Sequence, residues 1–308
     1  MPDAPHPPSI PGPDLPDGSD QPDLPLPASL PRAPLAYQND AFLDSPDGRL
    51  LRIISEYQEP LARFRRERIE DTVVFFGSAR FRSHEELQPG ESADAVETAD
   101  YYESARILAR MVSEWAMNLP GPRHRFVITS GGGPGIMEAA NRGAYDAGAK
   151  TIGLNIKLSH EQHPNRYITP ALNFEFHYFF MRKLWFAYLA KALVVFPGGF
   201  GTLDEMFEVL TLAQTNKLAK KIAVVLYGSS YWKSVLNFDV LVAKGAIAQE
   251  DLALFQFADS PEQAFAFLQA GLRDYIRPPA QSQAAPPPQL PAPTAQELLG
   301  PDITPTRP

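Results

Sequence analysis

The sequence predicts an α/β fold in which a Rossmann-like, doubly wound parallel sheet carries helices on both faces. Two observations lead to this prediction. Short, apolar, β-branched runs alternate with segments of helical periodicity, which is the pattern of βαβ units. Two of these runs end in glycine-rich turns that open into helices, at 130–138 and at 196–205. In an open parallel sheet such turns gather beyond the carboxyl ends of the strands, where ligands bind.

The first half of the predicted domain supplies two strands and two helices. A strand over 71–76 ends in Gly77-Ser78, and a helix is expected over 99–118. A second strand, over 125–130, runs into the first glycine turn. There Pro134 fits the first turn of the next helix, because the missing N–H of proline costs nothing at that position.

The second half continues the alternation of strand and helix. Strands are expected over 151–156, 174–176, 192–196 and 221–227. Helices are expected over 178–190 and 202–215, and a polar loop over 159–166. Because crossover helices separate the strands, the sheet is expected to be parallel.

Proline marks both ends of the chain. Twelve of the 32 prolines fall within residues 1–34 and ten within 278–308, in segments with few large apolar residues. Such segments cannot bury enough surface to offset the entropy lost on ordering them. The sequence therefore predicts disordered Pro-rich tails over 1–45 and 278–308, on either side of a single domain over 46–277.

The net charge and the cysteine content exclude several classes of binding partner and site. A net charge of −8 argues against nucleic acid, and the basic run from Arg63 to Arg68 lies among glutamates, which favours a solvated helix face over a binding patch. The chain has no cysteine, which excludes disulfides and thiolate metal sites. No segment has the pattern of a signal peptide or a membrane span, so we expect a cytoplasmic protein without membrane contact.

The first glycine turn matches neither of two well-known phosphate-binding patterns. The spacing of Gly131, Gly133 and Gly135 does not fit a dinucleotide fingerprint, and no Gly-Lys-Ser/Thr element forms a P-loop. One interpretation is a tight strand-to-helix turn. The other is a ligand site, because three successive glycines exceed the need of a turn and let a ligand approach the backbone.

The second glycine turn adds a hydroxyl and two carboxylates to its glycines. One interpretation is a capping box, in which Thr202 caps a helix and Glu205 bonds back to it. That interpretation does not explain the glycines from Gly198 to Gly201. A phosphate seated on the backbone amides of Gly199 to Thr202 explains both the glycines and the threonine.

Arg182 lies in an aromatic segment, 178–186, with Lys183 as its neighbour. A guanidinium buried among aromatic rings needs an anionic partner, since stacking recovers only part of the cost of burial. The partner is either a carboxylate of the protein, in a structural ion pair, or a bound anionic ligand.

The six histidines show no spacing typical of metal ligands. His160 and His163 lie in an expected loop, and His177 is expected to be partly buried with a hydrogen-bond partner. We expect neither a metal nor a cofactor.

Three segments together resemble the LOG ("lonely guy") family: Gly131 to Ala144, Phe179 to Lys183, and Pro197 to Glu205. The likeness covers nearly all of residues 70–277, and the long form of the first segment looks like the larger bacterial branch. The family was once widely labelled "lysine decarboxylase". That activity would require pyridoxal phosphate on a Schiff-base lysine, and no lysine in the sequence is singled out for the role.

The resemblance implies a Rossmann-like enzyme that hydrolyses the N-glycosidic bond of a nucleoside 5′-monophosphate, AMP or a cytokinin riboside 5′-monophosphate. By motif position, Arg182 and Glu205 are the implied catalytic pair. The residues implied to bind the substrate phosphate are Gly198, Gly199, Gly201 and Thr202. The residues implied to line the pocket are Gly77, Ser78, Gly131, Gly132, Gly133, Gly135, Glu138, which would face the ribose, and Lys183.

Two other functions stay open at this point. The resemblance extends to non-catalytic proteins, including molybdenum-cofactor carriers, so a nucleotide-binding carrier or sensor is one alternative, and a phosphotransfer or other enzyme is another. The presence of both Arg182 and Glu205 favours hydrolysis. The resemblance also implies a homo-oligomer, a dimer or higher, and the aromatic-rich segment 178–190 has more apolar surface than one face of a sheet needs.

Overall fold

The computed structural model describes residues 32–158, 163–215, 217 and 220–276. Most of the two predicted tails lies outside these described residues, so the limits of the domain stay a prediction. The described part of the first tail contains a 3-10 helix, η2 (Ala36–Gln38), and a short helix, α1 (Asp40–Leu43). The chain divides into two compact units between Arg49 and Leu50, and the α/β fold belongs to the second unit.

The described residues form a seven-stranded sheet, with every pair of neighbouring strands parallel. The strands are β1 (Thr72–Phe76), β2 (Val127–Ser130), β3 (Thr151–Ile156), β4 (Asn173–Phe176), β5 (Ala190–Val195), β6 (Ala223–Tyr227) and β7 (Phe255–Ala258). Their order in the sheet is β4-β3-β2-β1-β5-β6-β7. The predicted fold class is confirmed.

The central strand β1 is buried along its whole length, which explains its continuous run of apolar and β-branched residues. Val74 pairs with Thr129 of β2 on one side and with Leu193 of β5 on the other. The edge strand β4 is less covered, and its Glu175 is exposed. The strands that the sequence predicts most plainly are thus those with neighbours on both sides.

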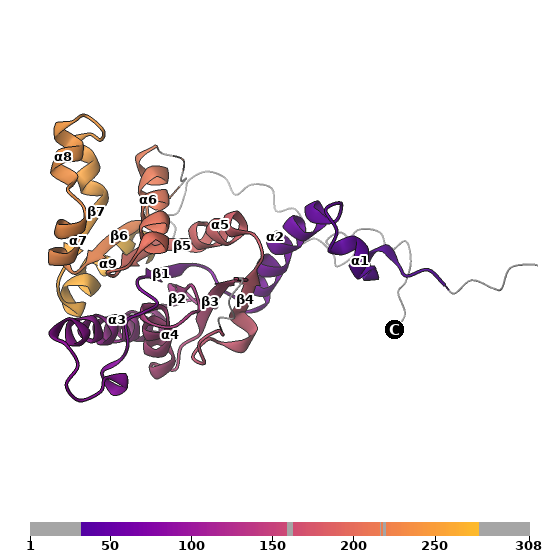
Figure 1. Ribbon diagram of the computed structural model, residues 1–308, viewed down its shortest axis with the longest axis horizontal. Coiled ribbons are helices and arrows are strands. Elements are labelled where there is room, and N and C mark those ends of the chain that lie inside the picture. The colour runs from indigo at the N-terminus through magenta and orange to yellow at the C-terminus, as the bar shows by residue number, and fades with distance from the viewer. Residues whose placement is uncertain (1–31, 159–162, 216, 218–219, 277–308) are drawn as a thin grey trace, which may run out of the picture. The chain divides into compact units, whose positions relative to one another are not determined.

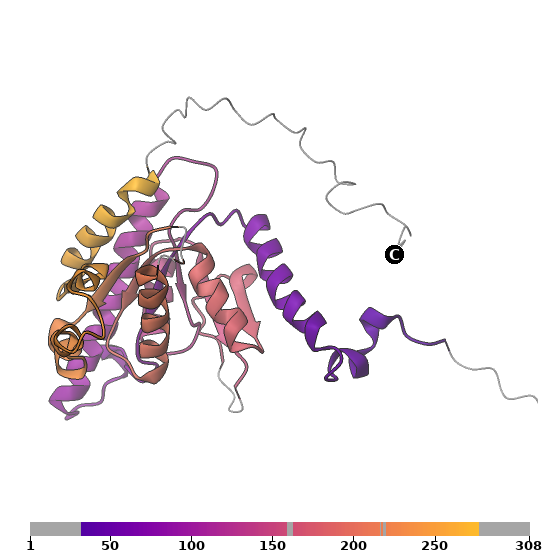
Figure 2. The ribbon, with the colours of Figure 1, turned by 90° about the horizontal axis from the view of Figure 1, so that it is seen from above.

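Helices cover both faces of the sheet (Figure 1). The longer ones are α2 (Arg49–Arg66), α3 (Ala93–Met117), α4 (Ile136–Asp146), α5 (Phe179–Leu189), α6 (Phe200–Gln214) and α9 (Pro261–Ile276). The shorter ones are η3 (His84–Glu86), η4 (Pro170–Leu172), α7 (Ser229–Val235), α8 (Phe238–Ala243) and η5 (Gln249–Leu254). Figure 2 shows α3 and α9 running side by side on one face, in agreement with their direct contacts.

Successive side chains of β1 point to opposite faces of the sheet and belong to two hydrophobic cores, one on each face. Val73 and Phe75 belong to the core that packs against α3, α4 and α9. Val74 and Phe76 belong to the core that holds Trp185 and the apolar sides of α2, α5 and α6. Both layers are required to bury a parallel sheet, so the fold is doubly wound.

Several element boundaries differ from the sequence prediction. The helix expected over 99–118 begins earlier, at Ala93, because the Ser92 side chain accepts a hydrogen bond from the Ala95 amide and caps it. Pro134 was expected inside the first turn of α4 but lies before it, since Gly135 is the N-cap residue. The prediction missed α2, α7, α8, β7 and α9.

The sequence predicts that the basic run from Arg63 to Arg68 is a solvated helix face. The structure shows that this is wrong for Arg63. α2 ends at Arg66, and Arg63 turns inward. Its Nη1 donates to the carbonyl of Asn173 at 2.8 Å, and its guanidinium lies 4.1 Å from the ring centroid of Phe174. Arg63 therefore ties α2 to the edge strand β4.

The order of the strands defines the place where a ligand is expected. From β1 the chain moves outward through β2 and β3 to β4, then returns and adds β5 on the other side of β1. The direction of winding thus reverses between β1 and β5. In open α/β sheets the binding crevice lies beyond the carboxyl ends of the strands at such a switch point.

Within the part of the chain that the structure describes, no helix combines the length and the apolar character that crossing a bilayer requires.

Candidate active site

Three loops meet beyond the carboxyl ends of β1, β2 and β5. Ser78, just after β1, joins them through its backbone: its N–H donates to the carbonyl of Pro197 at 2.9 Å, and its carbonyl accepts from the amide of Ile136 at 3.0 Å. The two glycine turns therefore come together, as predicted, with Gly77-Ser78 between them.

The first glycine turn, 131–135, needs its glycines for close packing. Gly135 has a φ of 69°, and a Cβ atom there would collide with the carbonyl oxygen of Ser78. At Gly131 a Cβ atom would stand 2.6 Å from Nη2 of Arg182. The turn is thus pressed against both the end of β1 and the Arg182 guanidinium.

The second turn does not form the capping box that was one interpretation of its sequence. α6 begins at Phe200 with Gly199 as N-cap, so Thr202 is the third residue of the helix and Glu205 lies in its second turn. No side chain caps the start of α6. The buried Thr202 hydroxyl instead packs under Gly198, where a Cβ atom would collide with it.

Two glycines at the start of α6 are not required by the fold. A Cβ atom on Gly199 or on Gly201 would meet no protein atom within 4 Å, and neither residue has a positive φ. Phe200, between them, is 92% exposed. The first N–H groups of a helix have no partner within the helix and lie at the positive end of its dipole. The start of α6 is therefore open at Gly199 and Gly201 and suited to an anion.

Glu205 is a buried carboxylate beside this open helix start. Its residue is 7% exposed, and burial raises the pKa of its carboxyl to about 7, although Lys183 and Arg182 oppose that rise. A carboxyl with such a pKa can change its protonation state near neutral pH. This is the behaviour expected of a group that takes part in acid–base chemistry or stabilises developing charge.

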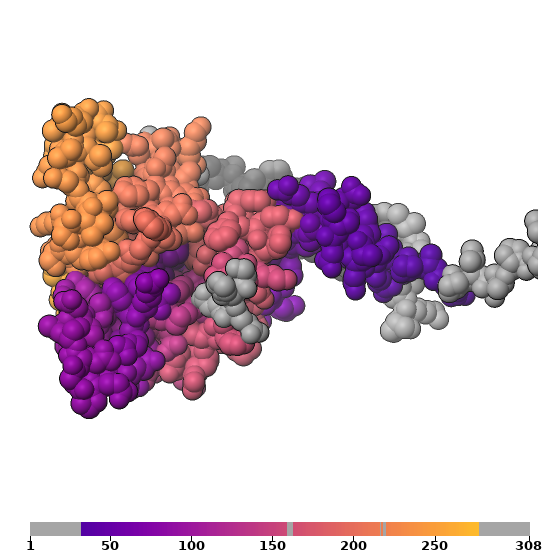
Figure 3. All heavy atoms as spheres, in the orientation of Figure 1, coloured from indigo at the N-terminus to yellow at the C-terminus, as the bar shows by residue number. Residues whose placement is uncertain are grey.

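Lys183 links α5 to three carboxylates on α6. Its Nζ lies 2.8 Å from Oδ2 of Asp204, 2.7 Å from Oε2 of Glu208 and 3.7 Å from Oε2 of Glu205. Burial lowers the pKa of Lys183, but the hydrogen bonds to Asp204 and Glu208 more than compensate and raise it. Lys183 thus stays charged and lies beside Glu205. In Figure 3 the surface of α6, in salmon, adjoins that of α5, in rose.

Arg182 is partly buried and lies against Gly131 of the first glycine turn. Its Nε donates to the carbonyl of Leu154 at 2.8 Å, and its guanidinium lies 5.1 Å from the ring centroid of Phe186. Burial lowers the pKa of Arg182, and the nearby Glu205 carboxylate opposes this effect. Arg182 forms no ion pair with a carboxylate among the residues that the structure describes, so the structural ion pair is not supported, and the ligand contact stays a prediction.

Glu138 stands in the first turn of α4 and accepts a hydrogen bond from the hydroxyl of Tyr102 at 3.0 Å. It is partly exposed. Gly132 and Gly133 complete the turn before it and are buried. All the pocket residues proposed from the sequence therefore come from the three loops at this edge of the sheet or from α4, α5 and α6, which adjoin them.

The histidines differ from expectation in one respect. His177 was expected to be partly buried, but it is exposed, because it follows the last residue of the edge strand β4. His163 is also exposed, and His160 lies outside the described residues. Among the residues that the structure describes, no group of three or more His, Asp or Glu side chains has the arrangement needed to hold a metal ion.

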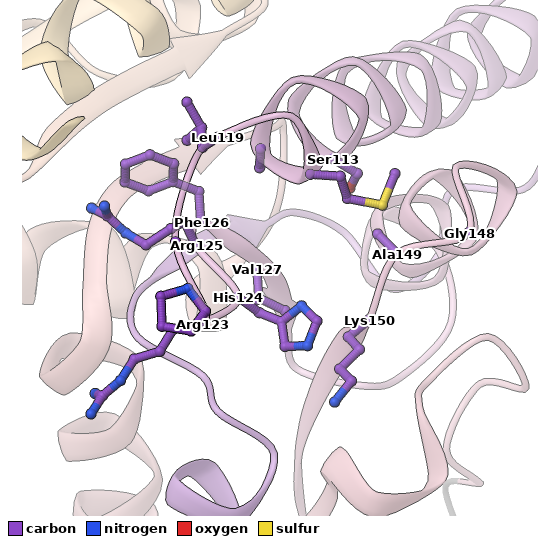
Figure 4. Close-up of a pocket in the computed structure, with 14 residues that line it drawn as sticks. Ser113, Leu119, Arg123, His124, Arg125, Phe126, Val127, Gly148, Ala149 and Lys150 are labelled. Carbon is purple, nitrogen blue, oxygen red and sulfur yellow. The ribbon is translucent and has the colours of Figure 1, made fainter.

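A hollow of about 380 Å³ lies at the opposite edge of the sheet, near the amino ends of β2 and β3 (Figure 4). There the ring of His124 and the side chain of Lys150 lie next to each other, and burial followed by the charge of Lys150 lowers the pKa of His124. Lys150 is paired with Glu67 at 3.0 Å. α3 and α4 both end near this hollow, where the negative ends of their dipoles favour positive charge.

Comparison with known proteins supports the interpretation of the three motifs. The family model described as "Possible lysine decarboxylase" matches residues 137–268. The cytokinin riboside 5′-monophosphate phosphoribohydrolase LOG of rice (Oryza sativa subsp. japonica) is 27% identical over 191 residues, which are 60% of this chain and 67% of the relative. By its sequence, this chain is similar to proteins of the LOG family. A further rice member, the probable phosphoribohydrolase LOGL3, is 30% identical over 133 residues, which are 40% of this chain and 57% of the relative.

The aligned segments leave a third or more of each of these LOG proteins unmatched. Among solved structures, the Moco carrier protein from Chlamydomonas reinhardtii aligns over 66% of this chain and 99% of its own, with 18% identity and a TM-score of 0.41.

Sequence reasoning missed two sets of residues at this site. Asp204 and Glu208 hold Lys183, and their spacing with Glu205 on one helix was visible, but the contact with Lys183 was not. Asn165 binds the first glycine turn, and nothing in its polar surroundings distinguished it from a loop residue.

Proposed function

We propose that this protein hydrolyses the N-glycosidic bond of a nucleoside 5′-monophosphate, releasing the free base and ribose 5-phosphate. The observation that carries the proposal is the position of the buried Glu205 carboxylate next to an uncapped helix start whose glycines the fold does not need. The Glu205 carboxylate suits charge stabilisation at a ribosyl cation, and the open start of α6 suits the phosphate of the same substrate.

The phosphate is proposed to bind the amides at the start of α6. Gly199 and Gly201 carry no side chain into the open space there, so an anion can approach the unpaired N–H groups directly. The exposed position of these glycines supports a ligand role because packing gives no other reason for them.

In the proposed reaction the bond between ribose C1′ and the base nitrogen breaks, and the oxygen of a water molecule bonds to C1′. The departing base takes up one proton, and the water gives up another. Positive charge develops on the ribose as the bond breaks, and the ionised Glu205 would stabilise it and orient the water. Arg182, held by Leu154, would position the substrate between the two turns.

A phosphorylated substrate is favoured over a free nucleoside. The phosphate lies away from the reacting bond, so its binding energy serves to place the sugar against Glu205. AMP and cytokinin riboside 5′-monophosphates are the proposed substrates, since related proteins carry the latter in their names.

Incubation with AMP tests the proposal. The expected products are adenine and ribose 5-phosphate, separated by chromatography and absent with Glu205→Gln. Adenosine under the same conditions is expected to react far more slowly. Tight binding of AMP without any product would overturn the proposal and favour a nucleotide carrier or sensor.

We also propose that the protein assembles with a second copy of itself through α5. Four large apolar side chains of this helix are exposed: Phe179, Phe180, Leu184 and Tyr188. Monomeric proteins rarely expose so many neighbouring apolar groups, so a partner surface is the simplest use for them.

A further inference from the structure

Four polar side chains form a buried hydrogen-bond network behind the first glycine turn. They come from β2, α4, β3 and the loop that follows β3: Ser130, Asn141, Thr151 and Asn165. Asn141 lies at the centre. Its Oδ1 accepts from Ser130 Oγ at 2.6 Å and from Asn165 Nδ2 at 2.9 Å, and its Nδ2 donates to Thr151 Oγ1 at 2.5 Å. Since polar groups are costly to bury, a network of this size needs all its members satisfied.

Asn165 is the member that reaches the glycine turn. Its side-chain Nδ2 donates to the carbonyl oxygens of Gly132 at 3.1 Å and Gly133 at 3.0 Å, and its backbone N–H donates to Gly132 at 2.8 Å. Its own Oδ1 accepts from the amide of Tyr167 at 3.2 Å, which fixes which end of the carboxamide faces the turn. Asn165 thus forms hydrogen bonds with two successive carbonyl groups of the turn.

The hydrogen bonds from Asn165 determine the direction of the Gly133 N–H. In a trans peptide the carbonyl and the following N–H point in opposite directions, so holding the Gly132 carbonyl toward Asn165 turns the Gly133 N–H away from it. The Gly132 N–H is bonded to Ser130 Oγ at 3.1 Å, and Pro134 has no N–H. The Gly133 N–H makes no hydrogen bond with any residue that the structure describes. Of these three positions, only Gly133 has a donor left for a ligand.

We propose that Asn165 is a positioning residue, which holds the first glycine turn so that the Gly133 amide faces the bound nucleotide. The proposal rests on the proposed function, because it takes the nucleotide as the ligand. A glycine-rich turn has many accessible conformations, and fixing one of them in advance lowers the entropy lost when a ligand binds. The competing explanation is that the network only stabilises the fold.

Calorimetric binding of AMP in a Glu205→Gln background separates these explanations without relying on turnover. Glu205→Gln alone is expected to bind AMP, and Glu205→Gln/Asn165→Ala is expected to bind it about 10-fold or more weakly, the size of a lost hydrogen bond to a charged group. Asn237→Ala is the matched control, since Asn237 also bonds a backbone amide, at the start of α8, away from the glycine turns. It should leave the affinity unchanged.

A milder variant covers the case in which Asn165→Ala fails to fold. Asn165→Ser keeps one hydroxyl donor and should show an affinity between those of the parent background and Asn165→Ala. The Gly132 amide, which is bonded to Ser130 Oγ, should exchange its hydrogen faster than in the parent. With Glu205 intact, Asn165→Ser should raise KM for AMP more than it lowers kcat.

Two results would overturn the proposal in distinguishable ways. Unchanged AMP affinity in folded Asn165 variants, with Glu205→Gln binding AMP normally, would leave Asn165 a purely structural residue. Failure of Glu205→Gln itself and of the parent to bind AMP would remove the proposed function, and the role of Asn165 with it.

Discussion

The Nη2 atom of Arg182 lies 2.6 Å from the place that a Cβ atom on Gly131 would occupy. The guanidinium therefore fills the space left by a missing side chain, while its Nε is held by the carbonyl of Leu154. Two segments, the first glycine turn and β3, thus determine the position of this side chain of α5. The absence of a side chain at Gly131 is therefore one of the conditions for the observed position of the Arg182 guanidinium.

Gly131→Ala is expected to displace Arg182 and to lower kcat/KM for AMP by about 10-fold or more, since small misplacements of positioning groups are costly. Arg182→Ala should lower it by about 10²-fold. Steady-state kinetics of the double variant provides the check. If Gly131→Ala acts through Arg182, the double variant will be no worse than Arg182→Ala alone, and a further loss would mean that the added methyl blocks the substrate itself.

Gly201→Ala is expected to separate stability from function. Replacing glycine by alanine in an exposed helical turn without a positive φ should stabilise the protein by up to about 1 kcal/mol. The same methyl would stand in the proposed phosphate site, so KM for AMP should rise while the rate with adenosine stays the same. Thermal denaturation and kinetics on both substrates measure this, and an unchanged KM for AMP would place the phosphate elsewhere.

Glu205→Gln should change how stability depends on pH. The pKa of Glu205 is raised from 4.5 to about 7 in the folded protein, so the folded state binds more protons than the unfolded state between these values. The parent therefore loses stability as the pH rises from about 4.5 to about 7, by an amount on the order of 3 kcal/mol. Glutamine does not titrate, so Glu205→Gln should gain stability relative to the parent between pH 5 and pH 8. Denaturant unfolding at both values tests this, and a constant difference would contradict it.

Lys183→Met should move the pH dependence of catalysis. The proposed chemistry uses ionised Glu205, so kcat/KM should rise as the pH passes through about 7. The charge of Lys183 lowers the pKa of Glu205, so its removal should shift the midpoint of this rise to higher pH. A pH profile with an unchanged midpoint and only a lower plateau would instead indicate a direct contact between Lys183 and substrate.

Leu184→Glu should disrupt self-association through α5. Leu184 is 39% exposed among other apolar side chains, and a charge in a closed interface is costly. Sedimentation should show the parent as a dimer or larger and the variant as a monomer. Ile107→Glu, on the exposed side of α3, provides the control. A parent that sediments as a monomer would remove the proposed interface.

The sequence was informative where structure is decided locally. The run of 71–76 and both glycine turns could be identified because buried parallel strands and strand-to-helix turns have local patterns. The start of α6 was misjudged because Thr202, Asp204 and Glu205 form a good capping pattern, yet the helix begins at Phe200. The proximity of Arg182 to Glu205 came from family resemblance alone.

The contacts that could not be predicted join segments far apart in the chain. Lys183 meets Asp204 and Glu208 only because α5 and α6 pack side by side. Asn165 meets Gly132 because the loop after β3 folds back over the end of β2. Neither contact has a periodicity or a composition that marks it in the sequence.

The place of β5 beside β1 has a consequence for the nascent chain. A chain that has left the ribosome only as far as Phe176 can form β1 to β4, but one edge of β1 then has no partner. That edge is the middle of the finished sheet, apolar and without charged residues to protect it from pairing with another chain. Arg182 and Glu205 have not yet emerged from the ribosome at that stage. The strand that closes this edge, β5, lies between these two residues in the sequence, so closing the edge also unites the halves of the site.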